Sequence, residues 1–572
     1  CSFRDGIAKH FVSAMATIET TGLRRAERIR DWVKFRREAV EEGRTATMKR
    51  IVLLPGSDPA RTAALIATLL RSGVEVSRAN EAFTSTRAHA YADNQVGGRR
   101  FDAGAYIIDL AQPQGRAARS VLEPSPSMDT AFARMQVERF QRNYRRGTNV
   151  AGEGYEFYDV TAWSLPVTFG VDAYWTEDAG PVASVRVARP DEPAALGGVA
   201  GARPARSAYV FTSQRNGAPR MAYQLLARGY RVAISERPIE AGGRHFSRGT
   251  YIVRVGRNDA SLHTIIEQLA RESGVDVYGV NSAFSESDQF GIGSESVWDL
   301  KLPTIALVGD DGVSQTSYGA AWFVLEQRYG IPFTPVSTQW LGSGELSRFN
   351  VIIIPDAYSG ALSRLVGKEG ADRLRDWVRS GGTLITFAGA SAWAAQENVN
   401  LTSARAVGAD AKPDTGTAAP KTDTIAANAR RRETASERVS DDLLAVTSPS
   451  ATSGKPAPLP GSHFDVVLDR TSWLTGGYED QRLTVMLDGS TFLTLSKEGA
   501  NVGVFPKTGL LHRAGFVWPE NTERLLRNSA FLIDEPTGGG HVVLFVNEPL
   551  FRAWWHALDR LVLNAIVLGP SL

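Results

Sequence analysis

A serine follows a short apolar run in an arrangement that would place its hydroxyl at a sharp turn. Residues 383–387 (Thr-Leu-Ile-Thr-Phe) suit one buried strand, Gly389 permits a tight turn, and a helix can begin at Ala390. Strand, turn and helix with a hydroxyl at the corner is the layout of a nucleophile elbow. Ser391 is therefore a candidate catalytic nucleophile. The alternative is a helix-capping serine, because Trp393 replaces the second glycine of the Gly-x-Ser-x-Gly pattern.

Histidines are the next residues that could do chemistry, as metal ligands. The chain has eight, none of them followed by Glu at the third position: His10, His89, His245, His263, His463, His512, His541 and His556. A catalytic zinc site needs three protein ligands and an open position for water. His263 and Glu267 would share one face of a helix, which more simply predicts a surface pair. Cys1 is the single cysteine and has no partner for a disulfide. The sequence therefore predicts no metal and no cofactor bound to this chain.

Three copies of a strand–helix–strand pattern would position these residues. The first strands are predicted at 51–54, 209–211 and 305–308, the helices at 59–71, 219–228 and 317–329, and the second strands at 73–76, 229–232 and 330–333. A closing strand repeats as well, because Phe101 to Ile108 and Phe246 to Val253 share the pattern Phe-x-x-Gly-x-Tyr and a following apolar pair. Buried strands joined by helices predict an α/β fold with parallel sheets covered by helices.

The ends of the chain carry further elements. Residues 1–45 predict two helices, with Ile7, Phe11, Met15 and Ile18 on one apolar face of the first. Seven cationic side chains lie between positions 24 and 37, which indicates either an anion site or a solvated helix face. Near the other end, a strand at 541–546 precedes an apolar helix.

Two segments differ from the rest in composition. Tyr155 to Trp175 is rich in aromatic residues, which would line a ligand cleft or form a core at a domain interface. Residues 401–462 lack aromatic residues and are predicted to be a disordered insertion. The net charge of +2 and the lack of an apolar run of about 18 residues predict no nucleic-acid partner and no membrane span.

The third strand–helix–strand unit, with its elbow, late strand and final helix, resembles a class I glutamine-amidotransferase-like domain. The order of the longer segments resembles the C-terminal half of large bacterial zinc carboxypeptidases of the M14 type. The segments that carry this resemblance are the two opening helices, the duplicated units, the run Tyr158-Asp-Val-Thr-Ala-Trp-Ser-Leu-Pro166 and the ending from His541 to Asn564.

The resemblance implies four regions. Residues 1–45 would be the closing helices of an upstream peptidase domain, 46–200 a first α/β accessory unit and 201–302 a second. Residues 303–572 would be an amidotransferase-like domain with the flavodoxin-like three-layer fold, interrupted by the insertion at 401–462. The parent protein would act outside the cytoplasm, in the periplasm or the medium.

The chemistry that the resemblance implies would lie before Cys1. The zinc ligands and the general base of the peptidase would be supplied by the upstream domain, which would be the partner of this chain and bind the peptide substrate. The amidotransferase pattern is also incomplete, because the elbow has no Cys and the late strand ends in Asn547-Glu548-Pro549 without a His. We therefore expect an accessory region. The alternatives are a serine hydrolase that uses Ser391 and a non-catalytic binding module built on Tyr155–Trp175.

Overall fold

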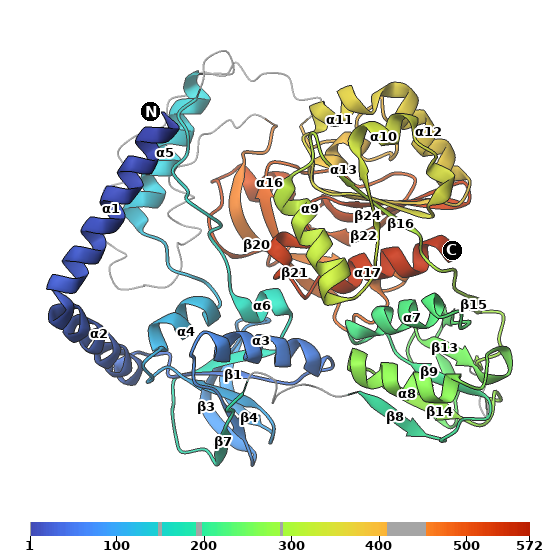
Figure 1. Cartoon of the computed structure of the whole chain (residues 1–572), viewed down its shortest axis with the longest axis horizontal. Helices are drawn as coiled ribbons and strands as arrows, with labels where there is room; N and C mark the ends of the chain where they lie inside the picture. Colours follow the sequence, from blue (N-terminus) through green and yellow to red (C-terminus); the bar gives the residue numbers. More distant parts are fainter. Residues whose placement is uncertain (1, 147–151, 190–196, 286–289, 409–453) are drawn as a thin grey trace. The chain divides into compact units, whose positions relative to one another are not determined.

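The computed structural model describes residues 2–146, 152–189, 197–285, 290–408 and 454–572 (Figure 1). The chain divides into two compact units. The first consists of Cys1–Gly56, Thr62–Glu123 and Val171–Ala194, and the second of Ser57–Arg61, Pro124–Gly170 and Ala195–Leu572. No helix among the described residues has the length and apolar character needed to cross a membrane.

The first unit begins with two long helices and continues into a sheet. Helices α1 (Phe3–Leu23) and α2 (Arg25–Thr45) follow one another with a break at Arg24, and the two helices are as predicted. The sheet has the strand order β4-β3-β6-β1-β5-β2-β7. Its strands are β1 (Arg50–Leu53), β2 (Ser77–Ala79), β3 (Phe83–Ala90), β4 (Val96–Phe101), β5 (Tyr106–Asp109), β6 (Ala173–Thr176) and β7 (Ser184–Arg186). Helices α3 (Pro59–Arg71) and α4 (Gly115–Leu122) lie in the connections.

The second unit contains a related sheet with the strand order β15-β10-β13-β9-β14-β8. Its strands are β8 (Gly198–Gly201), β9 (Ala208–Phe211), β10 (Ala233–Ser235), β13 (Tyr251–Arg254), β14 (Asp276–Val280) and β15 (Val297–Asp299). The strands β11 (Ile239–Ala241) and β12 (Arg244–Phe246) pair with each other, and the helices are α7 (Gly217–Ala227) and α8 (Leu262–Ser273). Helices α5 (Thr130–Arg146) and α6 (Leu165–Phe169) also belong to this unit.

The two sheets confirm the duplication that the sequence predicts. Strands β6-β1-β5-β2-β7 of the first sheet correspond, in order, to β14-β9-β13-β10-β15 of the second, and every neighbouring pair in both series is antiparallel. The predicted parallel pairing is therefore wrong for these two units. The first and second strands of each unit do run in the same direction, but the closing strand, β5 or β13, lies between them and runs the opposite way.

The helix in each unit ends at the predicted glycine, but the following strand starts later than expected. Gly73, Gly229 and Gly330 all have positive φ, which suits the left-handed end of a helix. The next amide then bonds back to the helix, as in Val74 N to Leu69 O at 3.0 Å and Tyr230 N to Leu225 O at 3.0 Å. These residues complete the helix terminus, so β2 and β10 begin only after it.

The third sheet carries the parallel arrangement. Its first five strands have the order β17-β16-β18-β19-β25, all parallel. They are β16 (Ile305–Gly309), β17 (Thr334–Ser337), β18 (Val351–Ile354), β19 (Thr383–Phe387) and β25 (Gly540–Phe545). In chain order this is 2-1-3-4-5, the order of flavodoxin-like sheets. The predicted α/β class and its flavodoxin-like last domain are confirmed.

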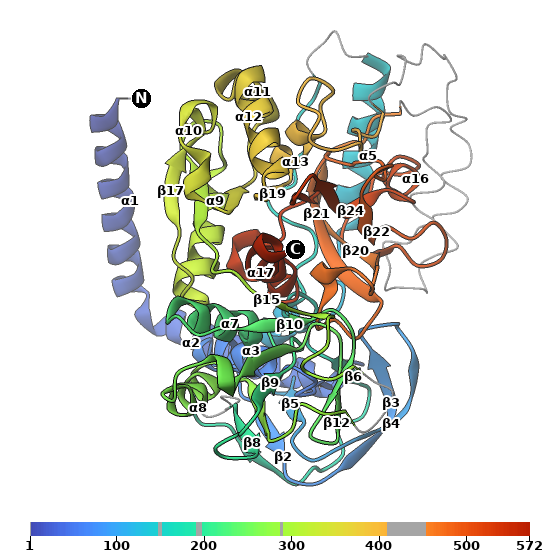
Figure 2. The same ribbon diagram turned by 90° about the vertical axis from the view of Figure 1, so that its right-hand side faces the viewer.

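Helices cover both faces of this parallel sheet, as Figures 1 and 2 show. Alternate strand residues point to opposite faces, so Leu307 and Ile353 join one core while Val308 and Ile352 join the other. On the first face lie α9 (Gln315–Trp322), its π-helical continuation (Phe323–Arg328) and α17 (Asp559–Leu568). On the second face lie α10 (Thr338–Ser343), α11 (Ser359–Leu365), α12 (Gly367–Arg379) and α13 (Gly389–Ala394).

The sheet continues beyond β25 in antiparallel strands. These are β20 (Leu459–Leu468), β21 (Arg482–Gly489), β22 (Ala500–Val504), β23 (His512–Ala514) and β24 (Ala530–Thr537), with the short helix α16 (Thr522–Leu526). The predicted insertion 401–462 is wrong at both ends. Leu401 and Leu459 are buried, and the Thr402 hydroxyl donates to the buried Glu535 carboxylate at 2.7 Å. Short apolar residues and strand pairing order these ends despite their polar composition. The middle of the predicted insertion, residues 409–453, lies outside the described residues.

Candidate functional site

The elbow that the sequence predicts is present, but its corner is occupied by a different residue. Strand β19 ends at Phe387 and α13 begins at Gly389, and between them Ala388 has φ 44° and ψ −111°. A positive φ is strained for a residue with a side chain, and it is the backbone geometry found at nucleophile elbows. Ala388 presents only a methyl group at this position. The corner of the elbow therefore offers no nucleophile.

Ser391 lies in the first turn of α13 and is fully buried. Its Oγ lies 2.7 Å from the carbonyl oxygen of Phe545 and 3.0 Å from that of Thr386. The hydroxyl thus joins the ends of β25 and β19, and no side chain caps the start of α13. The structure supports neither of the two roles considered for Ser391, because the Oγ is inaccessible and is committed to backbone acceptors.

The carboxyl ends of the parallel strands gather a set of acidic and hydroxyl side chains that the sequence analysis did not combine. The Ser317 hydroxyl of α9 donates to the carboxylate of Glu548, which follows β25. The Asp356 amide, after β18, donates to Ser317 Oγ at 3.0 Å, and Asp356 Oδ1 accepts from the Gly389 amide at 2.9 Å. In a sheet with this order, ligands bind at this edge. The strand order was the signal that would have brought these residues together.

Glu548 has an unusual protonation equilibrium. Burial raises the pKa of its carboxyl to about 7, against a smaller opposing effect of the hydrogen bonds from Ser317 and from the Leu550 amide. The nearby Asp356 carboxylate also raises this pKa. A carboxyl with a pKa near neutrality can exchange a proton in general acid–base chemistry. The elbow, with alanine at its corner, offers Glu548 no nucleophile, and the hydroxyl that does lie beside it, Ser317, is itself buried.

The histidines do not converge on a metal site. Among the described residues, no group of three or more His, Cys, Asp or Glu side chains is arranged to hold a metal ion. His263 Nδ1 lies 2.8 Å from the Tyr209 hydroxyl, and His541 Nδ1 lies 2.8 Å from Asp534 Oδ1. Burial lowers the pKa of His463 to about 3, so this imidazole is neutral. The donor set in the described part of the chain does not fit a catalytic zinc ion.

Several aromatic residues of the segment pack in cores rather than line a cleft, whereas Tyr158 is fully exposed. Within the second unit, Tyr155 packs at a tilt against Trp518 with ring centroids 4.5 Å apart, and Phe157 packs on Phe516 at 4.8 Å. Its last residues belong to β6 in the first unit, where Trp175 stacks on His89 at 3.5 Å. Ring-on-ring packing occupies these aromatic faces, so they do not line a ligand site in the described structure.

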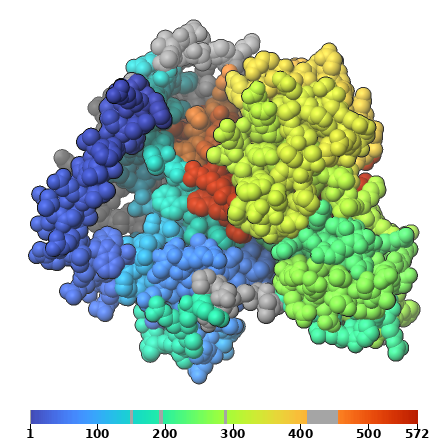
Figure 3. Space-filling model, in the orientation of Figure 1, coloured from blue at the N-terminus to red at the C-terminus, as the bar shows by residue number. Residues whose placement is uncertain are grey.

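Helices α1 and α2 of the first unit carry half of the exposed large apolar side chains in the described part of the chain. No residue of α1 is buried, and Phe11 and Ile18 are 66% and 65% exposed. In Figure 3 helix α1 is dark blue, and Figures 1 and 2 agree that α1 extends away from the sheet of its own unit. The exposed large apolar residues of α1 and α2 are Phe3, Ile7, Phe11, Val12, Met15, Ile18, Leu23, Ile29, Trp32 and Phe35.

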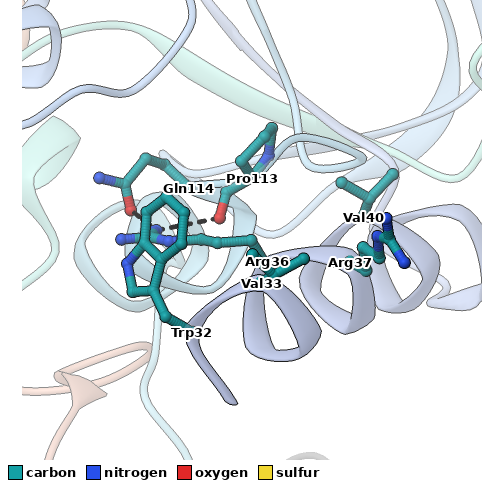
Figure 4. Close-up of a pocket in the computed structure, with 7 residues that line it drawn as sticks. All are labelled: Trp32, Val33, Arg36, Arg37, Val40, Pro113 and Gln114. Carbon is teal, nitrogen blue, oxygen red and sulfur yellow. Dashed lines mark hydrogen bonds between the residues drawn. The ribbon is translucent and has the colours of Figure 1, made fainter. Parts of the chain in front are cut away.

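A cavity opens where α2 meets the turn at Pro113 and Gln114 (Figure 4). Its volume is about 410 Å³, and α2 contributes Trp32, Arg36 and Arg37 to its lining. The Arg36 guanidinium donates to the Pro113 carbonyl at 3.0 Å and to the Gln114 side-chain oxygen. This cavity is a candidate binding site in the described structure.

Comparisons with known proteins add little. No family model matches the chain, and no curated protein matches it. Among solved structures, a β-galactosidase from Bacillus circulans sp. alkalophilus is similar over 45% of this chain and 30% of its own, with 15% identity and a TM-score of 0.24. A glutamine amidotransferase from Thermotoga maritima is similar over 43% of this chain and 76% of its own, with 7% identity and a TM-score of 0.26. At these scores the likenesses carry no argument about function.

Proposed function

We propose that this chain is a non-catalytic accessory region of a larger zinc carboxypeptidase, and that α1 and α2 are the surface on which the peptidase domain packs. The observation that carries the proposal is the exposed apolar surface of α1 and α2. A 21-residue helix with an apolar stripe and no buried residue gains nothing from packing in this chain. Such isolated helices are marginal in water, because most helix stability in proteins comes from tertiary packing.

The C-terminal half of α2 is firmly attached to the rest of the unit, which suits a docking element. Ala39 of α2 is buried, and Gly43 packs so closely that a Cβ there would lie 2.1 Å from the Leu110 carbonyl oxygen. The Glu42 carboxylate accepts from Arg116 Nε at 2.7 Å. Helices α1 and α2 are therefore fixed at the C-terminal end of α2, and the rest of their length presents apolar side chains to a partner. Burial of apolar surface stabilises by about 25 cal/mol per Å², which would favour covering this stripe.

The elbow supports the non-catalytic part of the proposal. Ala388 occupies the strained corner, and Ser391 is buried among backbone carbonyls. Because the described residues do not fit zinc, the metal and the cleavage of C-terminal residues from peptides would belong to the peptidase domain. On this proposal the parent protein acts in the periplasm or outside the cell.

Hydrogen exchange tests the proposal directly. A longer chain that includes the upstream region should protect the amides of residues 3–23 by at least about tenfold relative to this chain, since covered helices open less often. It should also retain zinc and release C-terminal residues in a chelator-sensitive way, whereas this chain after dialysis should do neither. Equal exchange of α1 in the two proteins would contradict the docking role. Zinc retained by this chain alone would contradict the assignment of the active site to the other domain.

A further inference from the structure

We infer that the cavity beside α2 receives an apolar side chain flanked by carboxylates, so that the partner segment that docks there is an acidic amphipathic helix. The inference rests on the proposed docking role of α1 and α2 and adds the chemistry of the partner surface that covers them. It stands on three observations in the first unit: the shape of the cavity, the aromatic and cationic side chains in its wall, and the charge of α2.

The cavity walls are held in place by contacts within the unit. Arg36 is anchored to the turn at Pro113 and Gln114, and its guanidinium lies 5.4 Å from the centre of the Trp32 ring. Outside the cavity lining, Arg116 of α4 lies 4.3 Å from the centre of the Phe35 ring of α2. These cation–π contacts fix the aromatic rings before any partner arrives. Preorganised tryptophan and arginine side chains around a pocket are the usual composition of an energetic centre in protein interfaces.

The charge around the cavity selects the partner. Helix α2 has seven cationic and five acidic side chains, but the cavity lining contains Arg36 and Arg37 and no acidic residue. Arg28 pairs with Asp31 at 2.9 Å and Lys34 with Glu38 at 3.7 Å, whereas the cavity residue Arg37 has no ion pair with any described residue. A carboxylate on the partner would pair with Arg37 and steer the approach of the partner.

The shape of the site favours a protein segment over a lipid surface. A basic amphipathic helix lies flat on a membrane with its apolar face free. Here the C-terminal half of α2 is fixed to the unit through Ala39 and Gly43, and Pro113 and Gln114 rise beside it to form a second wall. The apolar surface is therefore concave at this point, with room for a side chain.

Two synthetic helical peptides test the inference on this chain. Both have 18 residues and the same leucine stripe, but the polar face of one is glutamate and that of the other lysine. We expect the acidic peptide to bind at least tenfold more tightly by fluorescence anisotropy. Arg37→Glu and Trp32→Ala should each weaken it at least tenfold. Lys34→Glu makes the same charge change on α2 outside the cavity lining and should weaken it less than threefold.

Each alternative outcome overturns the inference. Equal binding of the two peptides would exclude charge selection, and equal effects of Arg37→Glu and Lys34→Glu would exclude the cavity. Binding of vesicles with anionic lipids that is lost in Arg37→Glu, without acidic-peptide binding, would assign the surface to a membrane. The docking role itself is tested separately by exchange in the longer chain: protection of α1 that Arg37→Glu leaves intact refutes the acidic partner alone.

Discussion

Helices α1 and α17 show how little the composition of a helix decides where it lies. Both helices are rich in apolar residues, yet none of the 21 residues of α1 is buried and all ten residues of α17 are. Helix α17 even buries charged groups, because neighbours satisfy them: Arg328 donates to Asp559 at 2.9 Å and the Tyr329 hydroxyl donates to the same carboxylate at 2.7 Å. The difference is the presence of covering elements, which α17 has within its unit and α1 lacks.

Removing a charge from α17 should have the largest effect. Arg560 is buried, its Nε lies 3.3 Å from Asn216 Oδ1, and its guanidinium lies 4.9 Å from the Tyr478 ring. Arg560→Ala would leave the buried Asp58 carboxylate with less compensation, and we expect a loss of about 3–5 kcal/mol in the free energy of unfolding. Urea denaturation measures it. Arg30→Ala on the exposed face of α2 is the control, and a similar loss there would remove the contrast between the helices.

The pH dependence of stability should report Glu548. Its folded pKa of about 7 is above the ordinary value of 4.5, so the stability that its protonated form contributes is present below pH 4.5 and is lost as the pH rises to about 7. Glu548→Gln should remove this loss, on the order of 1–3 kcal/mol between those pH values. Thermal unfolding of both proteins across pH 4.5–7.5 gives the answer, and parallel curves would refute the assignment.

Ser391→Ala should cost less, about 1 kcal/mol, because one hydroxyl bridge between β19 and β25 is lost. An activated-serine probe should label neither protein, since the hydroxyl is buried. Ser347→Ala, at an exposed serine, serves as the reference for stability. Labelling of the wild type that disappears in Ser391→Ala would restore the hydrolase hypothesis.

Phe11→Ala should have the smallest effect. Exposed side chains without contacts contribute within about 0.5 kcal/mol, although phenylalanine is a large residue. Leu561→Ala in α17 removes fewer atoms but should cost about 2–5 kcal/mol, because the leucine is fully buried. If both substitutions lower the free energy of unfolding of this chain by the same amount, then α1 is covered in solution, for example by a second copy of the chain.

The sequence was most informative where local signals decide the structure. The glycines that end helices were read correctly, since only a left-handed residue closes the helix there, and Phe-x-x-Gly-x-Tyr located two equivalent closing strands. Strand pairing was predicted poorly, because the insertion of β5 between β1 and β2 depends on contacts distant in the chain. The elbow was placed correctly, but its corner was assigned three residues too late: Gly389 follows the strained residue instead of preceding the nucleophile. Glu548 was noticed only for what it replaces, since its pKa depends on burial.

The path of the chain through the duplicated sheets has a consequence for aggregation. Strand β6 pairs with β1 in the middle of the first sheet, yet it follows residues 124–170, which belong to the other unit. A cut within 124–170 that removed the downstream part would expose one edge of β1, whose Ile51, Val52 and Leu53 are fully buried in the intact sheet. An apolar edge of this kind recruits strands from other molecules. Fragments that end there should therefore associate through the exposed edge of β1, whereas intact chains that open at this point can exchange β6 and form domain-swapped dimers.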